Sequence, residues 1–365
     1  MLSMDKKIPV CKPKLPLAKE IFPYLERIDS NRFYSNFGPI VKEFEVELEK
    51  RLGLHNNNIL TTSNGTSSLE LCLKTFNLEK NSVVLCPTWT FIATAQSILN
   101  VGLKPLFIDV NFNDWCLDME KVNAQISEMK ENISAIIVVS PFGTKIDINI
   151  LENFSIENNI KIIIDAAAMS IDDIEPSKII PQTVSLHATK LLNCAEGGLI
   201  ISEDDNFIVE ARSLSNFGIS SNGINENGNN FKMSEYHAAI GLCSLKKWTE
   251  TSEFFFSIAK HYKKNLSDEN KIRFLPDYGV TRFNSFCIIQ SIEKPLQTHN
   301  FNNFETRKWW REGCHREPLF SDKFSDSKFP ITNKISSHYL GLPCFSDLKV
   351  SEIDFICEDV LKKLK

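Results

Sequence analysis

The segment Ile160-Lys161-Ile162-Ile163-Ile164-Asp165 is short, and almost every residue before its aspartate is apolar. A run of this length that is apolar on both alternating faces indicates a strand buried on both sides of a sheet. Similar runs occur at residues 59–62, 83–85, 105–109 and 135–139, and segments with helical spacing of apolar residues separate them. This alternation predicts an α/β fold with a mostly parallel sheet covered by helices on both faces.

The pattern changes after a further apolar run at residues 198–201. The sequence then predicts helices around 207–214, 234–248 and 253–266, a short strand at 286–289 and a last amphipathic helix at 350–364. We therefore divide the chain into three parts. Residues 1–55 form N-terminal helices that pack on the small domain or on a partner, residues 56–265 form a large domain, and residues 266–365 form a smaller C-terminal α/β domain.

Composition excludes several classes of protein. The 365 residues carry a net charge of −5, are 42% hydrophobic and include 26 phenylalanines, which argues against disorder and against a surface that binds nucleic acid or membranes. The ten cysteines contain no CxxC pair, so we expect reduced, mostly buried thiols and no metal. No apolar signal core or membrane-spanning run is visible, and a cytoplasmic location is expected.

The turn at residues 63–67 is a candidate ligand site, because it joins a predicted strand to a predicted helix. The sequence has neither the GxGxxG motif of dinucleotide-binding enzymes nor the GxxxxGK[ST] motif of nucleotide hydrolases. Gly65 lets the backbone approach a ligand, and the free N–H groups of a helix start favour an anion. Asn-Gly is also a common turn, so this signal is weak by itself.

Two more residues strengthen the case for a site. Asp165 follows its strand directly, where open sheets bind ligands, although it is equally suited to capping a helix. Lys190 follows 25 residues later (190 − 165), and most lysines are simply solvated. Together, an anion-binding turn, a carboxylate at a strand end and a lysine are what a pyridoxal phosphate site requires.

Further motifs extend over most of the chain in a fixed order, at residues 34–39, 64–69, 87–95, 102–110, 164–167, 185–190, 196–198, 230–234 and 306–310. In these motifs the chain resembles the DegT/DnrJ/StrS family of sugar-nucleotide aminotransferases, which are fold-type I pyridoxal phosphate enzymes. The resemblance implies that Lys190 forms the internal aldimine and that Asp165 pairs with the pyridine nitrogen. It also implies that the cofactor phosphate is bound by Gly65, Thr66 and Ser185.

The resemblance assigns the remaining contacts as follows. Phe91 lies against the cofactor ring, with Trp89 the less favoured candidate, and ordinary core packing is the alternative for both. Asn230 reaches the phosphate from the neighbouring subunit of a homodimer with shared sites. Arg307 is a candidate to bind the substrate diphosphate or the glutamate carboxylate, and Trp309 to pack on the sugar or the base. The equally plausible alternative is that Arg307 is a surface residue beside tryptophans of the core.

One position departs from the family. Ala168 stands where Gln or His is usual beside the cofactor's ring hydroxyl, and this puts the detailed geometry of the cofactor in doubt. A smaller change is Lys232 in place of the usual Arg.

Lys190 favours transamination over dehydration, because the family's dehydratases have a histidine at this position. The resemblance implies that L-glutamate donates its amino group to a keto-sugar nucleotide through the pyridoxal and pyridoxamine forms of the cofactor, in amino-sugar and O-antigen biosynthesis. A dTDP-linked 4-keto-6-deoxyhexose is the first choice of acceptor and a 3-keto isomer the second. An aminotransferase for a small phosphorylated ketone and a non-catalytic, regulatory cofactor-binding protein remain as alternatives. The sequence does not name the sugar, the aminated carbon or the nucleotide.

Overall fold

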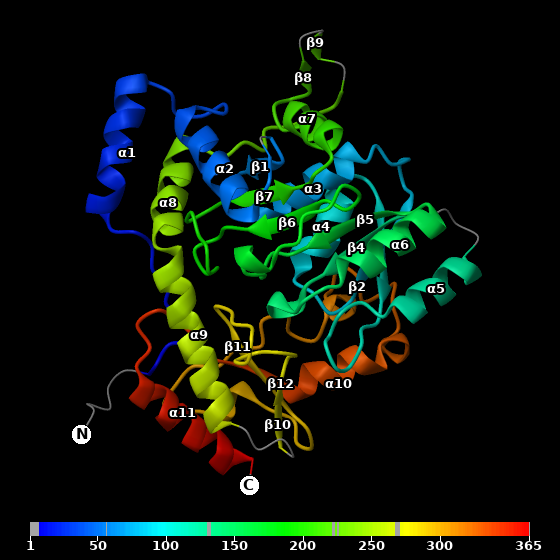
Figure 1. The fold of residues 1–365 in the computed structure, drawn as a ribbon. Coiled ribbons are helices and arrows are strands. Elements are labelled where there is room, and N and C mark those ends of the chain that lie inside the picture. The colour runs from blue at the N-terminus through cyan, green and yellow to red at the C-terminus, as the bar shows by residue number, and fades with distance from the viewer. Residues whose placement is uncertain are drawn as a thin grey trace.

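A computed structural model describes residues 7–55, 57–129, 133–220, 223–224, 226–266 and 271–364, and its large sheet occupies the middle of the molecule (Figure 1). The strand order is β1-β7-β6-β5-β4-β2-β3, and only β7 runs antiparallel to its neighbours. The predicted α/β fold with a mostly parallel sheet is therefore confirmed. The strands are β1 (Ile59–Thr62), β2 (Val83–Pro87), β3 (Lys104–Ile108), β4 (Ile133–Val139), β5 (Lys161–Asp165), β6 (Gln182–Ser185) and β7 (Gly198–Ile201).

Alternate residues of these strands enter two separate apolar cores, one on each face of the sheet. In β5, Ile162 and Ile164 belong to one core, whereas Ile163 belongs to the other. Helices α3, α4 and α7 supply the core that contains Ile163, and α6 contributes to the opposite core. The crossover helices between parallel strands are α3 (Gly65–Thr75), α4 (Ile92–Asn100), α5 (Met119–Glu128) and α6 (Ile148–Asn158), and α7 (Asp205–Leu214) follows β7.

The N-terminal helices α1 (Ala18–Asn31) and α2 (Pro39–Leu52) both pack on α8 (Glu235–Lys246), and α2 also packs on β1. The buried carboxylate of Glu235 accepts hydrogen bonds from the first backbone N–H groups of α2, at 2.8 Å from Ile40 and 3.0 Å from Val41. We expected these helices on the small domain or on a partner. Their contacts instead place them on the large domain, because α8 presents its buried face to both.

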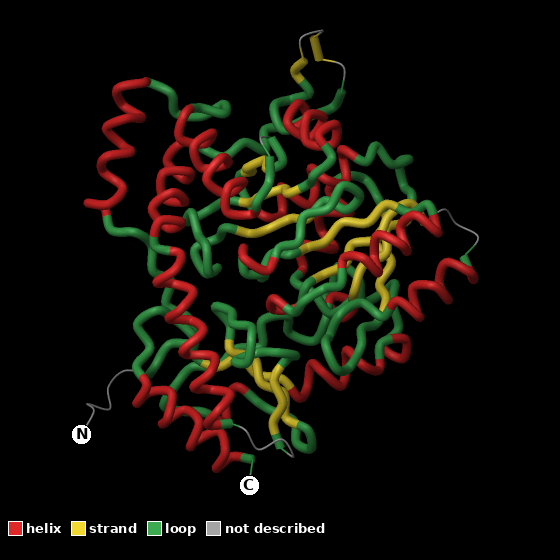
Figure 2. Tube along the Cα trace, viewed as in Figure 1, coloured by secondary structure: helices red, strands yellow, loops and turns green. Residues whose placement is uncertain are grey.

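The C-terminal part contains a second, antiparallel sheet of order β10-β11-β12, which is separate from the first (Figure 2). Helix α9 leads into it from α8 and packs on α11. Its elements are α9 (Trp248–Asn265), β10 (Ile272–Phe274), β11 (Cys287–Ser291), α10 (Pro330–His338), β12 (Tyr339–Leu342) and α11 (Val350–Lys363). The packing of α1 and α2 on α8 and β1 does not set residues 1–55 apart from the large domain, and the boundaries at 55/56 and 265/266 both stay predictions.

Short elements complete the chain. The hairpin of β8 (Ile219–Ser220) and β9 (Gly223–Ile224) projects from the body of the molecule beyond α7 (Figure 1). The 3-10 helices are η1 (Pro141–Gly143), η2 (Ile171–Asp173), η3 (Thr298–Asn300), η4 (Cys314–Arg316) and η5 (Asp326–Lys328).

Within the described residues, no helix is both long enough and apolar enough to cross a bilayer. All ten cysteines are free and eight of them are buried. The described part of the chain contains no group of three or more His, Cys, Asp or Glu side chains that could hold a metal ion.

Candidate active site

A cavity of about 360 Å³ lies where β5 and β6 end and α3 begins. This is the edge of a parallel sheet at which ligands bind in α/β proteins. Of the residues predicted to form the site, those lining the cavity are Gly65, Thr66, Phe91, Asp165, Ser185, Lys190 and Trp309. Residues that are distant in the sequence thus come together around one space.

The start of α3 forms the anion-binding end of this cavity. Asn64 caps the helix, and its side chain accepts a 2.8 Å hydrogen bond from the backbone N–H of Ser67. The N–H groups of Gly65 and Thr66 precede the first helical hydrogen bond, so they are available to a ligand. A Cβ on Gly65 would lie 3.0 Å from the Cβ of Ser185, which explains why glycine is needed where α3 approaches β6.

Asp165 is a buried carboxylate facing the cavity. Its Oδ2 accepts a 2.8 Å hydrogen bond from Thr94, and its Oδ1 accepts a 3.2 Å bond from the backbone N–H of Ala167. Burial raises the pKa of Asp165, whereas these two hydrogen bonds and the charge of Lys190 lower it. Among the described residues no salt bridge forms on this carboxylate, so a cationic group bound in the cavity would find an uncommitted partner.

Lys190 reaches the same cavity from the loop between β6 and β7. Its Nζ lies 5.2 Å from the centre of the Phe286 ring. Burial lowers the pKa of Lys190 to about 8, although the charge of Asp165 acts in the opposite direction. The amine is consequently neutral, and nucleophilic, far more often than an ordinary lysine at the same pH.

The two aromatic candidates for the cofactor ring occupy different environments. Phe91 precedes α4, lines the cavity and is 58% exposed, so its ring is free to cover a ligand. Trp89 is fully buried and packs edge-on against Trp115, Trp310 and Tyr339, so it stays a core residue. The structure therefore excludes Trp89 from the cavity wall.

Ala168 also lines the cavity, next to an aromatic cluster. Phe142 and Trp310 of this cluster stack with ring centres 4.2 Å apart. The carbonyl oxygen of Ala168 accepts a hydrogen bond from Asn284, which also binds the carbonyl of Phe142. The backbone at this position is thus held in place although the usual polar side chain is absent.

Two of the predicted residues lie outside this cavity. Asn230 is exposed beyond the β8–β9 hairpin, where its N–H donates to the side chain of Asn229. Arg307 is exposed, with its guanidinium carbon 4.7 Å from the centre of the Trp309 ring. Arg307 therefore borders Trp309, which lines the cavity, but is not itself part of the cavity wall.

The sequence analysis missed several residues in and next to the cavity. Thr94 does not line the cavity but donates a hydrogen bond to Asp165, and its position one turn after Thr90 within a quoted motif was a signal that could have singled it out. His187 and Glu196 also lie in quoted motifs, and their side chains approach to 3.7 Å. Trp310 lies beside Trp309 in the quoted motif 306–310. Phe142 and Phe286 carried no sequence signal for the site, because each enters the cavity wall from a separate part of the chain.

Comparisons with known proteins were made for the whole chain. The profile of the DegT/DnrJ/EryC1/StrS aminotransferase family matches residues 16–361. The chain belongs to this family. This aminotransferase is 30% identical to the dTDP-4-amino-4,6-dideoxy-D-glucose transaminase of Shigella dysenteriae, over 82% of each chain. It is 29% identical to the Escherichia coli enzyme of the same name, over 99% of this chain and 100% of the relative.

A solved structure from Bacillus cereus, assigned as a PLP-dependent aminotransferase, matches this aminotransferase with a TM-score of 0.88. The two share 26% sequence identity over 97% of this chain and 100% of the other. The cofactor of the aminotransferase is pyridoxal phosphate. The cavity fits this cofactor. The start of α3 suits its phosphate, the buried carboxylate of Asp165 suits its ring nitrogen, and Lys190, with its lowered pKa, suits its aldehyde.

Proposed function

We propose that this aminotransferase transfers the amino group of L-glutamate to a nucleotide-linked keto sugar. The observation that carries the proposal is that Lys190 and Asp165 face one cavity beside the open start of α3. A dTDP-linked 4-keto-6-deoxyhexose is the acceptor of first choice, which the substrate named in the two dTDP-sugar transaminase relatives supports. The product would serve amino-sugar and O-antigen synthesis in the cytoplasm.

In the proposed site each residue has a separate task. The N–H groups of Gly65 and Thr66, with the hydroxyl of Ser185, hold the cofactor phosphate. Asp165 keeps a proton on the ring nitrogen, and Phe91 covers the ring. The bound cofactor supplies an aldehyde that takes up the amino group and a ring that makes the donor's α-carbon acidic.

Lys190 acts twice in this scheme. Its Nζ would hold the cofactor through the aldehyde, and as a free amine it would take and return a proton at the donor's α-carbon. A lysine with a pKa of about 8 is well suited to take the proton from the donor's α-carbon, because near neutral pH its amine is neutral far more often than that of an ordinary lysine. Burial of the amine contributes to this property by disfavouring the ammonium form.

We also propose that the protein is a homodimer with shared sites, since Asn230 is exposed and lies outside the cavity of its own chain. In this arrangement Asn230 reaches the cofactor phosphate of the neighbouring subunit. Its exposed position next to the projecting hairpin supports the proposal.

The first half-reaction tests the assignment of the donor and of Lys190. L-Glutamate should bleach the absorbance of the lysine-bound cofactor in the native protein. Lys190→Arg should lack this absorbance and all turnover while keeping its fold, and Lys80→Arg, a change at an exposed lysine, should behave as native. Native-like absorbance and activity in Lys190→Arg would show that another lysine is the reactive one.

A panel of keto acceptors distinguishes the alternatives. A small phosphorylated ketone that is aminated in preference to every sugar nucleotide would favour the smaller substrate. A protein that binds the cofactor but does not respond to any donor or acceptor would be a regulatory member. Ala168 is the feature that keeps the second alternative open.

A further inference from the structure

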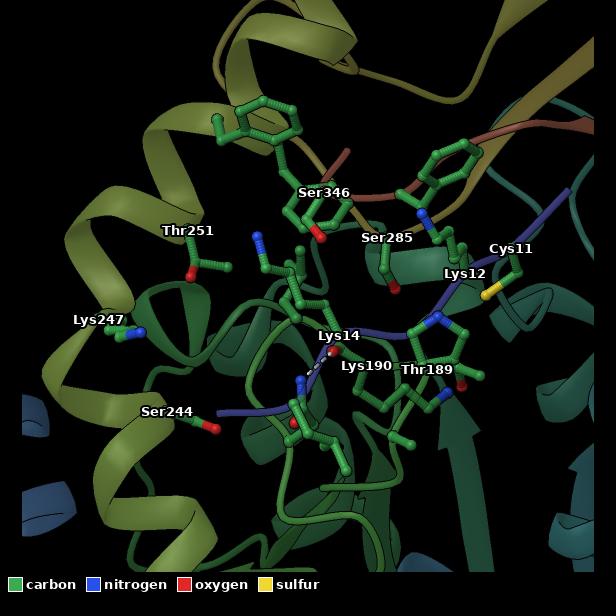
Figure 3. A pocket seen from close by; sticks show the side chains of 18 of the residues that line it. Cys11, Lys12, Lys14, Thr189, Lys190, Ser244, Lys247, Thr251, Ser285 and Ser346 are labelled. Atoms are coloured by element: carbon green, nitrogen blue, oxygen red, sulfur yellow. Dashed lines mark hydrogen bonds between the residues drawn. The ribbon is translucent and has the colours of Figure 1, made fainter. Parts of the chain in front are cut away.

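A second cavity, of about 180 Å³, lies on another side of the Thr189–Lys190 segment. It shares Thr189 and Lys190 with the active-site cavity, so both spaces adjoin the reactive lysine. Its remaining walls come from the N-terminal segment 11–16, from α8 and α9, and from residues 344–346 (Figure 3). None of the roles proposed for the cofactor uses this space.

Three buried polar atoms lining this cavity have no hydrogen-bond partner, the hydroxyls of Ser244 and Ser346 and the Oδ1 of Asn193. Asn193 is only 7% exposed, and its Nδ2 donates a 3.3 Å hydrogen bond to the carbonyl of Lys190. Buried polar groups are nearly always paired in native proteins. Unpaired groups gathered around one space therefore indicate that a polar ligand occupies it.

The charges around the cavity favour an anion. Lys12, Lys14 and Lys247 line it, and Figure 3 shows the three side chains around the same hollow. Lys12 and Lys14 share a single carboxylate, that of Asp347, at 3.3 and 3.2 Å, and Asp347 is not part of the cavity wall. Lys247 is paired with Glu20, and the exposed Glu250 is the acidic residue of the wall itself.

Size narrows the choice of ligand. The volume of about 180 Å³ corresponds to about six water molecules, which is enough for a diphosphate or the carboxylate arm of an amino acid. Both proposed substrates carry an oxyanion a few bonds from the carbon that reacts at Lys190. These are the side-chain carboxylate of glutamate and the diphosphate of the sugar nucleotide.

We infer that this second cavity is an oxyanion subsite that binds the acidic group of a substrate while its reacting carbon lies at Lys190. The inference rests on the proposed function, because it takes its two possible ligands from that reaction. Lys12 and Lys14 attract the oxyanion, and the hydroxyls of Ser244 and Ser346 donate hydrogen bonds to it. Asn193 accepts a hydrogen bond from a neighbouring hydroxyl or amino group of the same substrate.

The test is calorimetric binding of two probes, inorganic pyrophosphate and 2-oxoglutarate, to the enzyme loaded with its cofactor. The double variant Lys12→Ala/Lys14→Ala should bind at least one probe tenfold more weakly than native protein. Ser244→Ala, which does not alter the charge, should weaken the binding of the same probe. Lys80→Ala, which removes an exposed lysine elsewhere, should change neither affinity more than twofold. Cofactor content and circular dichroism establish that each variant is folded.

The two probes identify the source of the oxyanion. Weaker pyrophosphate binding assigns the subsite to the sugar nucleotide, and weaker 2-oxoglutarate binding assigns it to the amino donor. Equal affinities of native protein and double variant for both probes would overturn the inference. Because binding is measured without turnover, that result is distinguishable from a failure of the proposed function, in which the native enzyme aminates no sugar nucleotide.

Discussion

Thr94 donates a 2.8 Å hydrogen bond to Oδ2 of Asp165 inside the protein, and its own hydroxyl lies 2.9 Å from that of Thr90. All three side chains are buried, so this contact stabilises the charged form of a carboxylate whose pKa is raised by burial. The proposed pairing of Asp165 with the cofactor's ring nitrogen requires that charge. Thr94 is therefore expected to support cofactor binding without being part of the reacting groups.

Replacing Thr94 with valine should weaken pyridoxal phosphate binding about ten- to a hundredfold, because hydrogen bonds to charged groups contribute about 1.5–3 kcal/mol. The loss should be larger at acidic pH, since the pKa of Asp165 rises further without the hydroxyl. Titration of the cofactor absorbance measures the affinity. Thr94→Ser keeps a hydroxyl and should remain close to native, and an unchanged affinity in Thr94→Val would contradict the role.

The cofactor-free protein should capture pyridoxal phosphate at a rate that rises with pH around a midpoint near 8. Burial lowers the pKa of Lys190 to about 8, so half of the amine is neutral there, against roughly 0.3% for a lysine of pKa 10.5. Asp165→Asn should move the midpoint below 8, because the lost negative charge favoured the ammonium form. Stopped-flow absorbance tests this, and a rate still rising steeply above pH 10 would argue against it.

Ala168→Gln should change cofactor affinity by no more than about tenfold, which is the effect of one net hydrogen bond. The native protein should already bind the cofactor and turn over, because a phosphate site, Asp165 and Lys190 hold it without residue 168. Cofactor titration and half-reaction rates of both proteins provide the comparison. An inert native protein alongside an active Ala168→Gln would show that the active-enzyme interpretation is wrong.

Mixing inactive Lys190→Ala chains with inactive Asn230→Asp chains should restore part of the activity. One site of each heterodimer would keep both an intact Lys190 and an intact Asn230 if the neighbouring subunit supplies the asparagine. The added carboxylate should inactivate its own homodimer by repelling the cofactor phosphate. A mixture of Lys190→Ala with Lys190→Arg serves as the control and should stay inactive. No recovery after confirmed subunit exchange, or a monomer in sedimentation, would refute the shared site.

The fold and the main residues of the site could be predicted from the sequence, because short continuous segments of the chain indicate them. The run ending at Asp165 is short and apolar on both faces, which favours a strand buried on both sides, with its last residue where the strand ends. The turn at Gly65 and the segment ending at Lys190 adjoin other strands of the same sheet. Their meeting at one edge thus follows from the order of the strands.

What could not be predicted depends on contacts between distant segments. Nothing local to Ala168 indicates that Phe142, from a turn with positive φ, stacks on Trp310 beside it. The second cavity likewise arises only because residues 11–16 cross in front of α8 and α9. Packing of this kind leaves no periodic pattern in the sequence.

Transfer of nitrogen from ¹⁵N-labelled L-glutamate to dTDP-4-keto-6-deoxyhexose, followed by mass spectrometry, tests the central claim most directly. The native enzyme should produce a dTDP-linked amino sugar that is one mass unit heavier than the product made with unlabelled glutamate, and Lys190→Arg should produce none. A native enzyme that forms labelled product from no nucleotide-linked keto sugar, although glutamate bleaches its cofactor absorbance, would contradict the account.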